Sequence, residues 1–119
     1  MPHQGDIVLV PVPFTDLSSQ KRRPVIVISN DVYHRATTDM IVVAMTSNPA
    51  RVDYSFVIDT SDLGQGRLNR PGTVRVDKVY TLSQSLVAAN FGRVEDAALD
   101  RIRKVLLELL QPEKRVDIQ

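Results

Sequence analysis

The feature that most constrains the fold is a series of short β-branched runs separated by turn-forming residues. The run from Pro24 to Ile28 (Pro-Val-Ile-Val-Ile) is the purest of them, and β-branched side chains favour the pleated surface of a sheet. Similar short runs predict further strands at 7–10, 41–45, 54–58, 73–76, 79–82 and 87–94. Polar and turn-forming residues fill 14–22 and 59–72, which predicts two long loops.

The C-terminal part follows a different period. Between Glu95 and Gln111 the apolar residues recur in steps of three and four, which predicts a helix with one apolar stripe. Two acidic residues open this segment and Pro112 stops it, and 116–119 are expected to fray. Many short strands and one closing helix predict a mainly β protein: a small, strongly curved sheet or partly open barrel with the helix on one side, forming a single domain over 1–119.

Composition removes several classes of function. The 119-residue chain contains no cysteine, which excludes disulfides, thiolate metal sites and cysteine nucleophiles. It has no apolar run of the roughly 20 residues that cross a bilayer, and its N-terminus does not resemble a signal peptide, so we expect a cytoplasmic protein. His3 and His34 form no paired metal-ligand motif, and His34 is expected in a surface loop. A histidine base, a metal and a cofactor are therefore not expected.

The cations give a more specific hint. Eleven of the fifteen are arginine, whose planar fork suits phosphate recognition, but the net charge of +1 confines any anion-binding surface to a local patch. Arg22 and Arg23 directly precede the run that begins at Pro24, and Thr46 and Ser47 end the run at 41–45. Each pair alone is typical of a solvated turn, and each also suits a phosphate group.

Arg75 and Asp77 are the most informative pair. Period-two alternation places both on one face of a strand, with Val76 on the other. They could form a structural ion pair, or they could act together on a phosphodiester. In the second case Asp77 would take a proton from a ribose 2′-hydroxyl, and Arg75 would chiefly stabilise the charge that develops on phosphorus and the leaving oxygen.

The order of these blocks resembles the MazF/PemK family of bacterial toxins. The resemblance rests on Gly-Asp-Ile-Val-Leu-Val at 5–10, Arg-Pro-Val-Ile-Val at 23–27, Met-Thr-Ser at 45–47, Val-Arg-Val-Asp-Lys at 74–78, and Thr81. It covers essentially the whole chain, and although each block is weak alone, their co-occurrence is fairly specific. The resemblance implies the curved, SH3-like barrel that MazF, PemK and CcdB share.

The resemblance also implies a function. Members of this family usually form homodimers, cleave single-stranded RNA without a metal by 2′-hydroxyl attack, and bind an antitoxin through its acidic, partly disordered segment. It assigns catalytic roles to Arg23, Thr46, Arg75 and Asp77. It further implies RNA-binding positions, which in this chain are Arg22, Ser47, Lys78 and Thr81.

Some positions depart from the family pattern. The loop before Arg23 holds Leu17, Ser18 and Ser19 where many members have other side chains, and Lys78 and Tyr80 also differ. These differences concern RNA sequence preference more than catalysis. Two alternatives stay open: a CcdB-like inhibitor of DNA gyrase on the same barrel, and a family member that binds antitoxin or nucleic acid without cutting.

Overall fold

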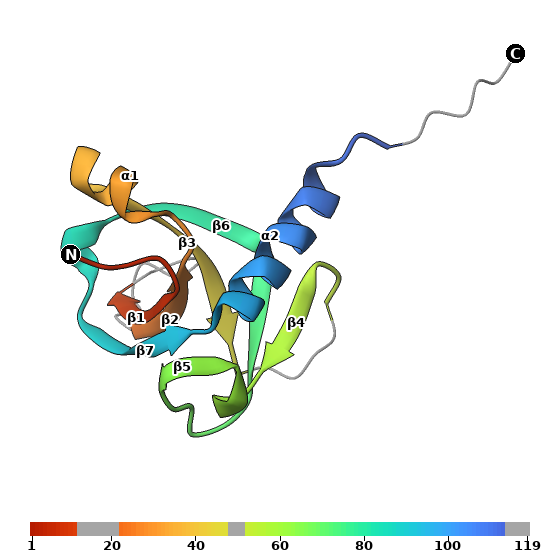
Figure 1. The fold of residues 1–119 in the computed structure, drawn as a ribbon, viewed down its shortest axis with the longest axis horizontal. Coiled ribbons are helices and arrows are strands. Elements are labelled where there is room, and N and C mark those ends of the chain that lie inside the picture. Colours follow the sequence, from red (N-terminus) through yellow and green to blue (C-terminus); the bar gives the residue numbers. More distant parts are fainter. Residues whose placement is uncertain (12–21, 48–51, 114–119) are drawn as a thin grey trace, which may run out of the picture.

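The computed structural model describes residues 1–11, 22–47 and 52–113 (Figure 1). Seven strands and two α-helices lie within these ranges. In chain order they are β1 (Asp6–Pro11), β2 (Arg22–Val27), α1 (Asp31–Ala36), β3 (Asp39–Thr46), β4 (Ser55–Ile58), β5 (Leu63–Gly66), β6 (Gly72–Ser83), β7 (Ala89–Val94) and α2 (Asp96–Leu110), with short 3₁₀ turns at Thr60–Asp62 and Gln84–Leu86.

The strands pair antiparallel in a single sheet. Their spatial order is β4-β6-β3-β2-β1-β7-β5, and Figure 1 shows this sheet curling into a half-barrel with α2 lying across one side. The prediction of a mainly β, strongly curved fold with a C-terminal helix is therefore confirmed. Among the described residues, no helix is both long enough and apolar enough to span a membrane.

Two apolar clusters hold the sheet, one on each face. The larger packs against Ala98, Leu99 and Ile102 of α2, as the predicted apolar stripe requires. The smaller lies on the opposite face and consists of six buried residues of β1, β2 and β3, namely Val8, Val10, Val25, Val27, Met40 and Val42. Burial of this many Val and Ile side chains is the main favourable contribution to folding. We call these the helix-side face and the far face.

Three sequence predictions about local structure were wrong, and one helix was not predicted. The segment between β2 and β3 contains a helix, α1, because the Asn30 side chain accepts a hydrogen bond from the Tyr33 amide and caps it. The expected loop at 59–72 contains β5, and the two strands expected at 73–76 and 79–82 are one strand, β6. His34 is not in a surface loop: it lies in α1 and is buried.

Strand β6 carries an irregularity that matters for the site. Its Arg75 is opposite Ala44 of β3, yet the next paired residue is Val79, opposite Val43. Residues 76–78 are therefore bulged out of the ladder with β3, and such bulges bend a strand and redirect its side chains. Most of the predicted 14–22 loop and the expected frayed end at 116–119 lie outside the described residues.

Candidate active site

The pairing of β2 with β3 brings Arg23 and Thr46 to the same end of the sheet. Val25 is opposite Ala44, the last pair of this ladder toward that end; Arg23 lies two residues beyond Val25, and Thr46 two residues beyond Ala44. Residues two positions apart on a strand project to the same face, so both lie on the far face to which Val25 also belongs. The first two predicted catalytic residues thus lie on one face at the same end of the sheet, although 23 positions separate them in the sequence.

Strand β6 adds the other two on the other side of β3. Arg75 is opposite Ala44, so it also projects from the far face. Thr46 lies two residues further along β3, opposite Thr73. Its guanidinium donates two hydrogen bonds to Asp77: Nε to Oδ1 at 2.9 Å and Nη2 to Oδ2 at 2.8 Å. This fork-to-fork geometry is the strongest form of Arg–carboxylate pairing. The predicted sharing of one face by Arg75 and Asp77 is confirmed by their contact.

The pair sets the charge state of both members. Hydrogen bonds from the Arg75 guanidinium, helped by its positive charge, lower the pKa of Asp77 against the opposing effect of partial burial. The same hydrogen bonds raise the pKa of Arg75. Asp77 is therefore an ionised carboxylate, and Arg75 a permanent cation, at neutral pH. An ionised carboxylate has about four lone-pair positions, and the hydrogen bonds from Arg75 use two of them.

The predicted RNA-binding residues are more scattered. Ser47 follows Thr46 at the end of β3, and Lys78 lies exposed in the bulge next to Asp77. Arg22 opens β2 and is exposed, one residue from Arg23 and so on the opposite face. Thr81 is opposite Ile41, far along β3 from Thr46 and on the helix-side face. The structure does not bring Thr81 to the other site residues.

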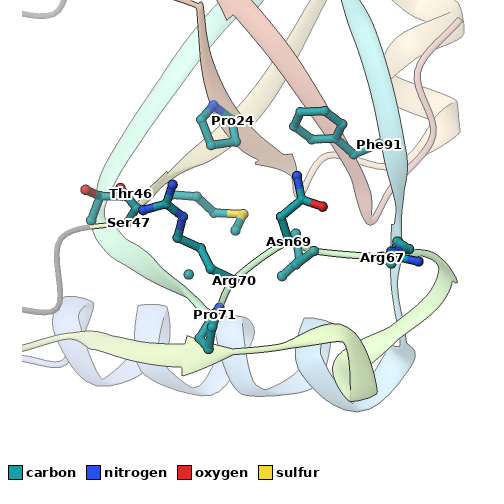
Figure 2. A pocket seen from close by; sticks show the side chains of 11 residues that line it. Pro24, Thr46, Ser47, Arg67, Asn69, Arg70, Pro71 and Phe91 are labelled. Carbon is teal, nitrogen blue, oxygen red and sulfur yellow. The ribbon is translucent and has the colours of Figure 1, made fainter.

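A pocket of about 310 Å³ opens beside the end of β3. Figure 2 shows it between Pro24 of β2, the β3 end at Thr46 and Ser47, and the connection from β5 to β6. Its remaining lining comes from Met45, Arg67, Leu68, Asn69, Arg70, Pro71, Gly72 and Phe91. The pocket thus shares Thr46 with the predicted catalytic set and adds residues from a distant part of the chain.

The sequence reasoning missed the polar residues of this pocket. Arg67, Asn69 and Arg70 fall in the segment that was expected to be only a loop. A signal was present, because two arginines and an asparagine lie within four positions, next to Pro71 and Gly72. No local sequence pattern indicates that this connection folds back against the end of β3, because that depends on long-range strand pairing.

Both histidines lie near the carboxylate of Asp31, and His3 Nδ1 is 2.9 Å from its Oδ2. His34 Nε2 lies 2.6 Å from Ser29 Oγ, which also accepts a hydrogen bond from the Ile41 amide at 2.8 Å. His34 Nδ1 lies 3.6 Å from Asp31 Oδ1, too far for a hydrogen bond, so the carboxylate does not orient the ring as it would in a Ser-His-Asp triad. Within the described ranges, no group of three or more His, Cys, Asp or Glu is arranged to hold a metal ion.

Comparison with known families identifies the chain over most of its length. The family model described as "PemK-like, MazF-like toxin of type II toxin-antitoxin system" matches residues 3–110. A comparison with curated proteins found no significant match. The family match bears out the resemblance that the sequence blocks suggested.

Solved structures with the same fold include two toxin complexes. An endoribonuclease in complex with its cognate antitoxin, from a Mycobacterial species, is 22% identical with a TM-score of 0.73, over 94% of this chain and 100% of that one. A MazE-MazF structure from Deinococcus radiodurans is 24% identical with a TM-score of 0.74, over 92% of this chain and 95% of that one. At these identities the likeness establishes the fold.

Proposed function

Because the chain belongs to the PemK-like, MazF-like family of toxin endoribonucleases from type II toxin-antitoxin systems, we propose that it cleaves single-stranded RNA without a metal. The observation that carries the proposal is the bidentate Arg75–Asp77 pair on the sheet face that also presents Arg23 and Thr46. A carboxylate, two guanidinium groups and a hydroxyl on one face suit the cleavage of a phosphodiester.

The proposed reaction begins at the ribose. Asp77 accepts the proton of the 2′-hydroxyl, O2′ forms a bond to phosphorus, and the bond from phosphorus to O5′ breaks. The products are a 2′,3′-cyclic phosphate and a 5′-hydroxyl, and Asp77 then returns its proton to solvent. The raised pKa of Arg75 makes it a poor proton donor, so water supplies the proton to O5′.

The other residues stabilise the negative charge that develops in the transition state. Arg75 and Arg23 are cations that balance the negative charge developing on the phosphoryl oxygens, and the Thr46 hydroxyl donates to one of those oxygens. Asp77 acts through the lone-pair positions that Arg75 leaves unoccupied. Cleavage of messenger RNA by this route would stop translation and growth.

Partners follow from the same proposal. The Mycobacterial and Deinococcus structures hold a toxin with its antitoxin. We extend this to the present chain as binding of a cognate antitoxin, whose acidic segment would cover the cationic face, and as a cytoplasmic homodimer. A low-hydrophobicity acidic segment folds only on its partner, which suits such a regulator.

The test is cleavage of a synthetic single-stranded RNA pool in the presence of EDTA. We expect Asp77→Asn, which keeps the size of the side chain, to lower the rate by about 10²- to 10⁴-fold, the usual contribution of a positioned base. Asp100→Asn is the matched control, because Asp100 also pairs with an arginine, Arg103, but on the exposed face of α2. Mass spectrometry should find cyclic phosphate and 5′-hydroxyl ends.

Two results would contradict the proposal. One is a folded, antitoxin-free protein that cuts no member of the RNA pool. The other is inhibition of DNA gyrase in a supercoiling assay without any RNA cleavage, which would assign the chain to the CcdB-like alternative.

A further inference from the structure

The geometry points to the pocket beside the end of β3 as a binding site for one nucleobase of the RNA, the base next to the cleaved bond. This inference rests on the proposed function and extends it from the phosphate to the base. The pocket is lined by residues 67–72, Phe91 and the ends of β2 and β3 (Figure 2).

The walls of the pocket suit a flat aromatic ring. Pro24, Leu68 and Phe91 contribute apolar surface, and Phe91 is 44% exposed although it is a large hydrophobic residue. An exposed aromatic side chain at a pocket in a nucleic-acid-binding protein is the usual platform on which an unstacked base lies. The volume of about 310 Å³ is at the small end of the range for ligand sites, which favours a single base.

The polar groups of the pocket suit the edge of a base and its phosphate. The Asn69 amide has both donors and an acceptor, so it can hydrogen-bond to a base edge. Arg67 and Arg70 add two cations, and neither forms an ion pair with another described residue. None of the described residues that line the pocket is acidic. An apolar side chain of a partner protein would desolvate the Asn69 amide without giving it a hydrogen-bond partner. The two cations and the amide of the pocket therefore favour RNA as its occupant.

The position of the pocket connects it to the predicted catalytic residues. Thr46 and Ser47 line the pocket, and Figure 2 shows Arg70 extending from its connection toward this end of β3. Arg23 and Arg75 project from the far face at the same end of the sheet, whereas Pro24 and Met45 project from the helix-side face. An RNA strand that passes over this end of the sheet can present a phosphate to the far face and the adjacent base to the helix-side face.

The experiment compares cleavage profiles on a randomised single-stranded RNA pool, read by sequencing the 5′-hydroxyl ends. For Asn69→Ala we expect a change of base preference at one position beside the cut, with the other positions unaltered. For Phe91→Ala we expect kcat/KM to fall about 5- to 150-fold, the range for loss of one stacked base. Phe91→Leu keeps apolar bulk without the ring, so it separates stacking from folding.

Matched controls exist on α1. Val32→Ala truncates another exposed apolar residue, and Arg35→Ala removes another exposed cation, both away from the pocket. Binding of a labelled RNA oligonucleotide to an Asp77→Asn background gives a second readout that does not need cleavage. There, Arg70→Ala should weaken binding and reduce its salt dependence by about one phosphate contact, whereas Arg35→Ala should not.

The outcomes distinguish this inference from the proposed function. If the wild-type protein neither cuts nor binds RNA, both fail. If it cuts RNA, but Asn69→Ala and Phe91→Leu leave the base profile and kcat/KM as they are, the proposed function stands and the pocket assignment is overturned. A one-position change of preference in folded Asn69→Ala, absent from Arg35→Ala, supports it.

Discussion

Replacing Gly66 with alanine should destabilise the protein by about 2 to 4 kcal/mol, because two backbones meet there with no room for a side chain. Gly66 of β5 is opposite Gly92 of β7, and both have positive φ, +81° and +149°. A Cβ on Gly66 would lie 2.9 Å from the Gly92 Cα and closer still to the Phe91 carbonyl oxygen. Neither neighbour is a flexible side chain that could turn away.

The magnitude follows from two costs. A left-handed backbone costs an L-residue about 1 to 2 kcal/mol. Relieving the clash also requires the two strands to separate by roughly 1 Å, which breaks hydrogen bonds worth about 0.5 to 1.5 kcal/mol each. The free energy of unfolding of a domain of this size is about 5 to 15 kcal/mol, so a loss of this size is a large part of it.

Gly64→Ala is the matched control in the same strand. A Cβ there would meet Glu95 Cγ at 3.7 Å and the Arg93 carbonyl oxygen at 4.0 Å, which are ordinary contacts. We expect Gly64→Ala to leave the free energy of unfolding unchanged or to raise it by up to about 1 kcal/mol, since alanine restricts the unfolded chain. Urea unfolding followed by circular dichroism measures both. If the free energies of unfolding of Gly66→Ala and Gly64→Ala differ by less than about 0.5 kcal/mol, the close approach of β5 and β7 is not as described.

Two further predictions concern the site and the core. Because the Arg75 guanidinium lowers the pKa of Asp77, the pair stabilises the fold above the pKa of an unfolded aspartate, and this stability is lost as pH falls through the lower folded pKa. Arg75→Gln should thus cost at most about 1 kcal/mol at pH 7 and nothing in strong acid, and NMR titration should show a raised Asp77 pKa. Ile102→Ala, at a residue 2% exposed in α2, should cost about 2 to 5 kcal/mol in urea unfolding, whereas Leu107→Ala, 59% exposed on the same helix, should cost under about 0.5 kcal/mol.

The parts of the fold that were predictable are those that local patterns determine. The β-branched runs became β1, β2 and β3, and the stripe of three- and four-residue steps became α2, because burial of one face decides both. Strand β5 was missed because its sequence, Leu-Gly-Gln-Gly, opposes strand formation, and pairing with β7 overrides that preference. Helix α1 was missed although Asn30 followed by Asp31 is a recognisable start signal.

The candidate site divides in the same way. Arg75 and Asp77 could be placed on one face from the sequence because only two positions separate them. That Arg23 and Thr46 lie on one face at the same end of the sheet depends on the register of β2 against β3, which no local pattern specifies. The pocket that includes Asn69 is harder still to predict from the sequence, since it forms only when the connection after β5 closes against the ends of β3 and β2, some 20 and 45 positions away.

The bulge in β6 explains why alternation succeeds up to Asp77 and fails beyond it. Before the bulge, even-numbered Val74 packs on the helix-side face. After it, even-numbered Tyr80 and Leu82 pack against the far-face cluster. An insertion of three residues is odd, so it exchanges the two faces for every later residue of the strand. Thr81 would share a face with Arg75 in a regular strand, but the exchange turns it to the helix-side face. The same insertion releases Asp77 from the ladder with β3, so that its carboxylate can reach back to Arg75 and, in the proposed reaction, keep lone pairs for the proton of the 2′-hydroxyl.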